Sequence, residues 1–183
     1  MEEPYGRDSA GGAAGLDDSL LAGPITRQRA QALAATHPAV MTDLAEWTRQ
    51  AIRERDWRRV EKLANLAAPL RAPGVAAVLR ELLDADIREV NNEDLVEILG
   101  ELGAAEAAGS VFRAAKRLLE SDAPGYWLAQ KAVLSLGEIG TPEALECLRV
   151  MTLPSWPDVV RWEAAVELGV EEELGFDEET MVG

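Results

Sequence analysis

The sequence predicts an all-α protein: an α-solenoid of about four helix pairs with a leading helical pair. The segment at residues 99–103 (LGELG) recurs at residues 136–140 (LGEIG), an offset of 37 residues. Each copy lies between one apolar helical pattern and the start of another. Alanine is abundant throughout, which favours helix and lets helices approach closely. Self-similarity at a period of a few tens of residues is typical of solenoids, whose helix pairs bury their apolar faces against one another.

The repeat extends on both sides of these two copies. Residues 132–137 align with residues 164–169 at an offset of 32, and the apolar positions of 63–76 align with those of 95–108 at the same offset. The alignments give about four units between Arg58 and Gly169. Both ends depart from the pattern, because Pro69 interrupts the first unit and acidic residues replace the last partner helix. We expect both ends to be caps.

The helices are expected in the following order. The first runs from Pro24 to Ala35, and His37-Pro38 breaks the chain because a residue before proline avoids the helical conformation. The second ends near Arg55, and the third follows Asp56 as its cap. The later helices are expected at residues 75–83, 92–103 with Asn92 as cap, 105–119, 127–139, 142–150 with Thr141 as cap, and 159–168.

Four glycines recur in register within the repeat. Gly103 and Gly140 follow the ends of helices, where a left-handed residue is needed. Gly100 and Gly137 fall one turn earlier, where glycine costs a helix about 1 kcal/mol. Such a cost is explained if the partner helix of the same pair crosses closely at these positions.

The chain is expected to have three regions. Residues 1–24 are rich in Gly, Ala, Ser and Asp without an apolar period, so we expect them to be disordered. Residues 25–170 form the solenoid, and residues 171–183 form an acidic C-terminal tail or cap. No segment approaches the roughly 20 apolar residues of a membrane span, and the start of the chain does not resemble a signal peptide. With a single cysteine, a cytoplasmic location is expected.

The net charge of −15 is unevenly distributed. Residues 26–62 carry eight bases against five acids, whereas the chain from Trp162 onward carries eight acids and no base. This polarity argues against nucleic acid as a partner, because phosphate neutralisation needs a basic stripe over the whole site. It favours a partner with a basic surface. The alternative that stays open is that the acidity only keeps the protein soluble.

Few residues are suited to catalysis or metal binding. The only histidine, His37, is expected to be a capping or exposed residue. The only cysteine, Cys147, has the helical spacing of a small core residue and excludes an internal disulfide. The glycines lack the strand and lysine of a phosphate-binding loop, and the acids at 171–173 lack the spacing of a calcium loop. We expect no catalytic residue, no cofactor and no metal.

The unit Leu-Gly-Glu-(Leu/Ile)-Gly followed by a helix resembles HEAT repeats, most closely the short bacterial variety first described in phycobilin lyases. The resemblance covers residues 94–114 and 131–151 well, and residues 58–83 and 159–169 loosely. It implies that the second helix of each pair lines a concave face, whose side chains are the first candidates for partner contact. These candidates are Arg80, Asp84, Glu106, Ser110, Arg113, Arg117, Glu143, Glu146 and Arg149. The alternative is an ordinary solvated face with weak ion pairs.

The chain has five tryptophans, a residue enriched at the hot spots of interfaces. Trp156 lies between Ser155 and Pro157 in a predicted break, so we expect it to be partly exposed and count it among the candidate contacts. For the tryptophans in general, the alternative is a place in the core at a seam between helices.

These observations predict a non-enzymatic protein–protein interaction module that binds a partner with a basic surface. An immunity protein that neutralises a basic toxin and an adaptor both fit this prediction. The resemblance also implies a second class, a phycobilin-lyase-like protein that handles a chromophore or serves as an enzyme accessory subunit. The lack of a second cysteine or histidine counts against that class. Arginine supplies 15 of the 18 bases, which indicates a GC-rich bacterial genome. Neither nucleic acid nor membrane is expected as a partner, and the oligomeric state is left open.

Overall fold

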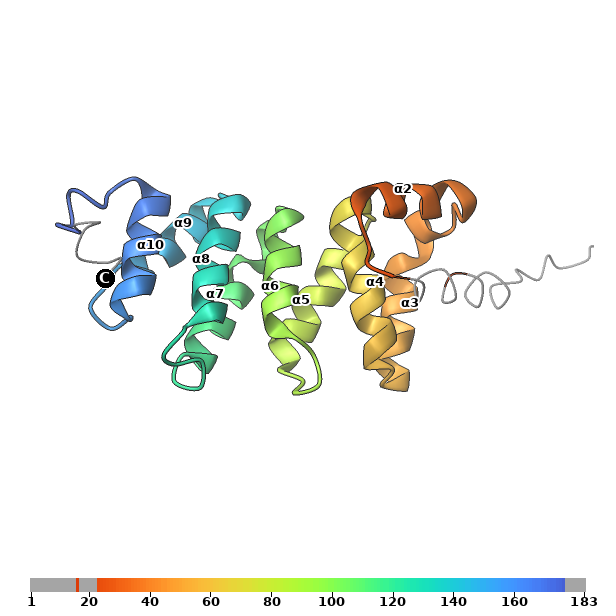
Figure 1. Ribbon diagram of the computed structural model, residues 1–183, viewed down its shortest axis with the longest axis horizontal. Helices are drawn as coiled ribbons and strands as arrows, with labels where there is room; N and C mark the ends of the chain where they lie inside the picture. The colour runs from red at the N-terminus through yellow and green to blue at the C-terminus, as the bar shows by residue number, and fades with distance from the viewer. Residues whose placement is uncertain (1–15, 17–22, 177–183) are drawn as a thin grey trace, which may run out of the picture. The chain divides into compact units, whose positions relative to one another are not determined.

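The structure is a computed structural model that describes Leu16 and residues 23–176 (Figure 1). Most of the expected disordered segment 1–24, and the acids beyond Phe176, lie outside the described residues. Every regular element among the described residues is a helix, which confirms the all-α prediction. These residues form two compact units, one up to Val75 and one from Ala76 onward. The division falls inside the segment 25–170 that the sequence analysis treats as one solenoid.

The first unit contains three helices, α2 (Arg27–Thr36), α3 (Val40–Glu54) and α4 (Trp57–Leu70). Helix α2 begins three residues later than Pro24, because Thr26 is extended and its hydroxyl accepts a hydrogen bond from the Arg29 N–H. Asp56 caps α4 as predicted, its carboxylate accepting from the Arg59 N–H at 3.1 Å. The core of this unit lies between α3 and α4, and its fully buried side chains include Leu44, Ala51, Val60 and Leu63.

The second unit continues the chain as pairs of helices. Helix α5 (Val75–Ala85) begins at the division and is followed by α6 (Asn92–Glu101), a 3₁₀ turn (Ala105–Ala107) and α7 (Ala108–Leu118). The chain then forms α8 (Trp127–Ile139), α9 (Pro142–Met151) and α10 (Asp158–Leu168). Figure 1 shows α6, α8 and α10 side by side in a first layer, with α7 and α9 in a second layer. This stacking of helix pairs agrees with the predicted α-solenoid arrangement.

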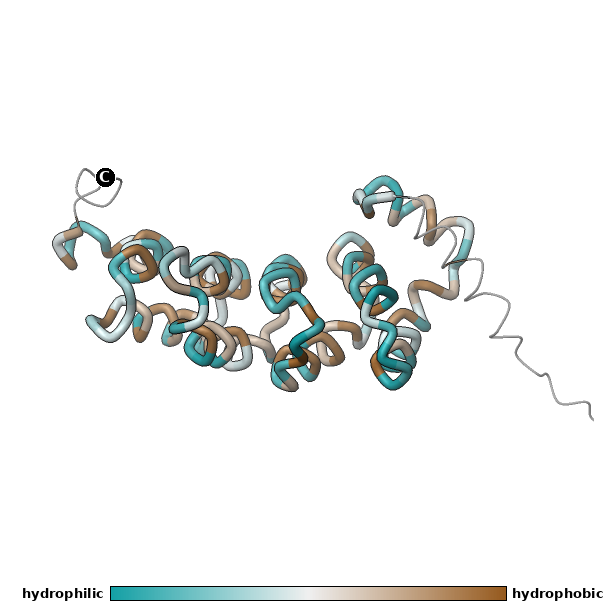
Figure 2. Tube along the Cα trace, turned by 60° about the horizontal axis from the view of Figure 1, so that its bottom comes forward, coloured by the Kyte–Doolittle hydropathy of each residue, from teal (hydrophilic) through white to brown (hydrophobic). Residues whose placement is uncertain are grey.

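The core of the second unit lies between its two layers. Figure 2 shows hydrophobic positions recurring along the helices of both layers. Leu99 and Leu136 of the first layer, and Val111 and Leu148 of the second, are all fully buried. Because these residues of the two layers face each other, neither layer buries them without the other.

Helix ends in the second unit follow the predicted chemistry, with one shift. Thr141 caps α9 and Pro142 occupies its first position, as predicted. Asn91, rather than Asn92, caps α6, and its side-chain oxygen accepts from the Glu93 N–H at 3.0 Å. Gly103 and Gly140 both have a left-handed backbone, with φ of 60° and 61°, as the sequence predicts for residues that close a helix.

The prediction that the partner helix of the same pair crosses closely at Gly100 and Gly137 is wrong, because the atoms nearest to both glycines belong to the next helix of the first layer. A Cβ added to Gly100 would lie 2.7 Å from the Cα of Ser135, in the backbone of α8. A Cβ added to Gly137 would meet the side chain of Glu167 in α10. Since Ser135 and Glu167 are separated by the repeat offset of 32 residues, equivalent positions face each other in successive helix pairs, through backbone at Gly100 and through a side chain at Gly137.

The segment after α10 turns back toward that helix. The Phe176 N–H donates to the carbonyl of Glu171 at 3.0 Å, and the Arg161 guanidinium lies 5.3 Å from the centre of the Phe176 ring. Leu174, in the same segment, remains half exposed. Phe176 therefore covers part of α10, as expected of a cap, whereas Leu174 does not.

Candidate functional site

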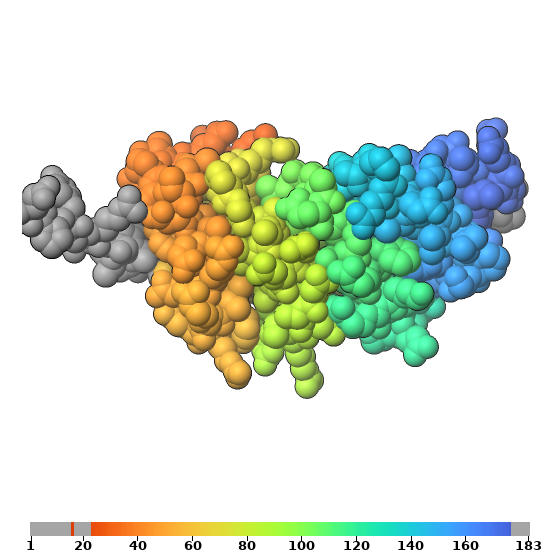
Figure 3. All heavy atoms as spheres, turned by 180° about the vertical axis from the view of Figure 1, so that it is seen from behind, coloured from red at the N-terminus to blue at the C-terminus, as the bar shows by residue number. Residues whose placement is uncertain are grey.

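The second unit presents two outer faces, one on each helix layer. The candidate contacts from the sequence lie on the outer side of α5, the 3₁₀ turn, α7 and α9, and α7 and α9 come to the front when the molecule is seen from behind (Figure 3). Most of them are exposed, while Arg80 is half-buried. Ser110 departs from the expectation, because only 2% of it is exposed. Its hydroxyl points inward to serve as a hydrogen-bond donor between helices.

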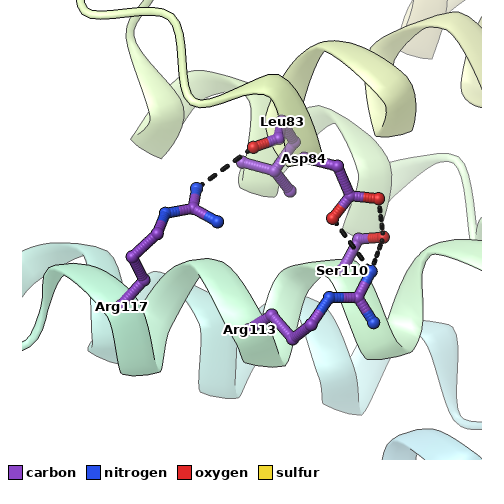
Figure 4. A network of polar contacts seen from close by, with 5 residues as sticks. All are labelled: Leu83, Asp84, Ser110, Arg113 and Arg117. Atoms are coloured by element: carbon purple, nitrogen blue, oxygen red, sulfur yellow. Dashed lines mark hydrogen bonds and ion pairs between the residues drawn. The ribbon is translucent and has the colours of Figure 1, made fainter.

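A polar network joins the end of α5 to α7 (Figure 4). The carboxylate of Asp84 accepts hydrogen bonds from the Ser110 hydroxyl at 2.8 Å and from Arg113 at 2.9 Å. Arg117 donates to the Leu83 carbonyl at 3.2 Å and forms an ion pair with Asp86 at 3.1 Å. Four of the candidate contact residues, Asp84, Ser110, Arg113 and Arg117, therefore connect α5 and its end to α7, and their first role is to hold these helices together.

The network changes the titration of Asp84. Partial burial on its own would raise the pKa of this carboxyl, but the Ser110 hydroxyl and the guanidinium groups of Arg113 and Arg80 outweigh it and lower the pKa. The network therefore adds stability above the ordinary carboxyl pKa of 3.8, and this stability is lost as the pH falls through the lowered value. Because the side chains are well exposed, the ion pair contributes at most about 1 kcal/mol.

Helix α9 carries the remaining charged candidates. Glu146 and Arg149 form an exposed ion pair at 3.0 Å within one helical turn. Glu143 leans over α7, with one carboxylate oxygen 2.9 Å from the position that a Cβ at Gly109 would take. Cys147 lies half-buried beside them, and burial together with the two glutamates raises the pKa of its thiol. The thiol is therefore held protonated, which fits a packing residue better than a nucleophile.

The expectation that Trp156 is partly exposed is wrong. Only 5% of it is exposed, and its ring centre lies 5.7 Å from that of Phe112 in α7, tilted by 52°. The flanking prolines do break the helix, but the break turns the indole inward against the second layer. A tilted aromatic pair of this kind is a packing contact of the core.

The outer face of the first layer carries exposed apolar side chains. Trp127 and Leu134, two turns apart on α8, are 64% and 57% exposed, and Val166 on α10 is 47% exposed. The indole of Trp127 packs over Gly125, where an added Cβ would lie 2.9 Å from the indole Cδ1. This face was not predicted from the sequence, although the helical spacing of Trp127, Lys131, Leu134 and Glu138 places them on one side of α8.

Carboxylates of three successive helices approach one another beside this apolar face. Partial burial raises the pKa of Glu138, and the charges of Glu101, Glu97 and Glu167 raise it further. Lys131 compensates part of this charge. It bonds Glu97 at 2.8 Å and reaches Glu93 at 3.8 Å, and its own pKa is raised by these partners. The first layer therefore presents a concentrated negative potential.

Replacing Glu138 with glutamine tests this repulsion. Because the folded protein raises the pKa of Glu138, its charge opposes folding above that pKa and has no effect below the ordinary value of 4.5. We expect Glu138→Gln to stabilise the fold at pH 7 by a few tenths of a kcal/mol, and this gain to disappear at about pH 4. Chemical denaturation at both pH values measures it, with Glu143→Gln as the control for losing one charge. A loss of stability at pH 7 would contradict the repulsion.

Other candidate sites carry less chemistry. A shallow cavity of about 200 Å³ lies between the start of α6, the end of α7 and the start of α8. Its lining is Val90, Asn91, Asn92, Glu93, Leu118, Ser121, Asp122 and Leu128. His37 ends α2, and its ring nitrogen lies 2.9 Å from the Thr36 hydroxyl. Over the described residues, no group of three potential metal ligands occurs, and no helix has the length and apolar character to span a membrane.

No family model matches the chain, and neither a curated protein nor a solved structure does. The resemblance to HEAT repeats thus depends on the residues quoted from the sequence alone.

Proposed function

We propose that the protein is a non-enzymatic protein–protein interaction module that binds a partner with a basic surface. The observation that carries the proposal is the group of carboxylates on α6, α8 and α10, whose charges add to the effect of burial in raising the pKa of Glu138. A basic partner relieves this repulsion, and complementary charge also speeds the encounter of two proteins. An immunity role and an adaptor role both need such a surface. Identifying the partner, a basic toxin in the first case and a component of an assembly in the second, distinguishes the two roles.

The two layers differ in how their charges are matched. On the second layer, Asp84 pairs with Arg113, Asp86 with Arg117 and Glu146 with Arg149. On the first layer, Lys131 is shared between Glu93 and Glu97 and Arg161 pairs with Asp158, while the charges that raise the pKa of Glu138, after burial, are those of other carboxylates. We therefore place the main contact with a basic partner on the first layer, rather than on the second-layer residues that the sequence favours.

A matched pair of triple variants tests this placement. Glu97→Gln, Glu101→Gln and Glu138→Gln together remove three charges from the first layer. Glu106→Gln, Glu143→Gln and Glu146→Gln remove three from the second. Poly-L-lysine of about 20 residues is the probe, and poly-L-glutamate of equal length is the negative control.

The first-layer variant is expected to bind poly-L-lysine about tenfold more weakly, since three exposed charge contacts of about 0.5 kcal/mol each sum to that factor. Its affinity should also depend less on salt. The second-layer variant is expected to change the affinity by less than about threefold. Absence of poly-L-lysine binding by the full chain would overturn the proposed function, and equal losses in the two variants would overturn the placement.

A further inference from the structure

The repeat register allows the two seams of the first layer to be compared position by position. Gly100 meets Ser135 across the α6–α8 seam, and Gly137 meets Glu167 across the α8–α10 seam. Gly137 thus lies 37 residues after Gly100, and Glu167 lies 32 residues after Ser135. By the same register, Leu134 on α8 takes the place of Glu97, and Glu163 on α10 takes the place of Lys131.

This exchange removes the cation from the position of the second seam that is equivalent to Lys131. At the α6–α8 seam, the Lys131 ammonium bonds the Glu97 carboxylate at 2.8 Å. At the α8–α10 seam, Glu163 occupies the position equivalent to Lys131, and Leu134 occupies the position equivalent to Glu97. The Oε2 of Glu163 is buried without a hydrogen-bond partner among the described residues, and burial raises the pKa of this carboxyl. Leu134 is more than half exposed.

Apolar side chains flank this carboxylate along both helices. Trp127 lies seven residues before Leu134, which spans about 10 Å of helix. Val166 lies three residues after Glu163, on the neighbouring turn of α10. An amphipathic helix presents apolar side chains over the same length when they are spaced at i, i+3, i+4 and i+7.

We infer that this α8–α10 face, made of Trp127, Leu134, Glu163 and Val166, docks a cationic amphipathic helix of a partner protein. The apolar side of that helix covers Trp127, Leu134 and Val166, and one of its lysine or arginine side chains pairs with the half-buried carboxylate of Glu163. Further cations face Glu138 and Glu167 at the edge. The inference rests on the proposed function and adds to it the form of the partner.

Charge excludes two other occupants of the face. An anionic membrane surface would repel the carboxylates of Glu138, Glu163 and Glu167. A second copy that docks through the same face would bring the same carboxylates together, which costs free energy at every pair of like charges. A partner of opposite charge has neither cost.

The test uses the full chain and a labelled 18-residue peptide with leucine on one helical face and lysine on the other. Two control peptides have the same length, one of lysine alone and one with glutamate in place of every lysine. Fluorescence anisotropy gives the affinities, and circular dichroism checks that each variant folds. Leu134→Glu changes the proposed face. Leu153→Glu makes the same change at a half-exposed leucine in the turn after α9 and is the matched control.

The leucine–lysine peptide is expected to bind more tightly than the lysine peptide, and the glutamate peptide is expected not to bind. Leu134→Glu should weaken the binding of the leucine–lysine peptide at least tenfold, and Leu153→Glu should weaken it less than twofold. Glu163→Gln should weaken the binding of this peptide by about threefold to tenfold, because a lysine of the peptide then loses its charged acceptor. None of these variants should change the affinity for the lysine peptide by more than about twofold, because each of them alters a single charge.

Three outcomes would overturn the docking face. Equal losses for Leu134→Glu and Leu153→Glu, or equal affinity for the leucine–lysine and lysine peptides, would leave a charged surface with no apolar site, and the proposed function would stand. Tight binding of the glutamate peptide would show that charge plays no part. Light scattering on the chain alone gives the third outcome, because a dimer abolished by Leu134→Glu would assign the face to a second copy. Failure of every cationic peptide to bind would instead remove the proposed function itself.

Discussion

Replacing Trp156 with alanine is expected to destabilise the fold by about 3–5 kcal/mol, because the change removes a large aromatic side chain from a packed core. Only 5% of Trp156 is exposed, and it packs against Phe112 of the preceding second-layer helix. The same change at Trp127, which is 64% exposed, is expected to stay within about 0.5 kcal/mol. Urea denaturation followed by circular dichroism at 222 nm measures both variants without relying on tryptophan fluorescence.

The pair also separates packing from recognition. Trp127→Ala should weaken the binding of a cationic amphipathic peptide and leave the stability of the fold unchanged. Trp156→Ala should lower the stability and leave the binding unchanged under conditions in which the variant still folds. Equal stability losses at the two positions would contradict the burial that the structure shows for Trp156.

Replacing Gly100 with alanine is expected to destabilise the fold although alanine is the better helix former. Alanine recovers about 1 kcal/mol of helix propensity, but overpacking costs about 1–3 kcal/mol when the obstacle cannot move. At Gly100 the obstacle is the backbone of α8, since an added Cβ would lie 2.7 Å from the Cα of Ser135. We expect a net loss of up to about 2 kcal/mol.

Gly137→Ala is the matched control in the next repeat. Its added Cβ meets the side chain of Glu167, which can rotate toward solvent. The net effect there is expected to lie between zero and a stabilisation of about 1 kcal/mol. Denaturant midpoints of the two variants give the comparison. A Gly100→Ala protein as stable as the unchanged chain would mean that α6 and α8 do not cross closely at this position.

The repeated glycines explain why the fold was predictable from the sequence. Gly100 marks where one first-layer helix crosses the next, and Gly103 and Gly140 mark where the chain turns into the second layer. Both functions depend on the lack of a side chain, so they leave a visible pattern. Helix caps were predictable to within a few residues for the same reason, because capping is local chemistry.

Contacts between distant residues were not predictable in this way. The prolines around Trp156 correctly indicated a break, but the burial of its indole depends on Phe112, 44 residues earlier in the chain. The sequence predicts that Asp84, Ser110 and Arg113 share the concave face. It does not show that Asp84 bonds Ser110, 26 residues later, and Arg113, 29 residues later. The exposed face of α8 and α10 was missed because apolar residues at helical spacing are more often core than surface.

The most direct test of the α8–α10 face as the binding surface is the shift of individual tryptophan indole N–H resonances in NMR spectra. The chain has five such signals, and Trp127→Phe and Trp156→Phe variants assign the two that matter. During titration with the leucine–lysine peptide, the signal of Trp127 is expected to move and that of Trp156 to stay in place. A Trp127 signal that remains unchanged at saturating peptide would contradict the assignment of this face.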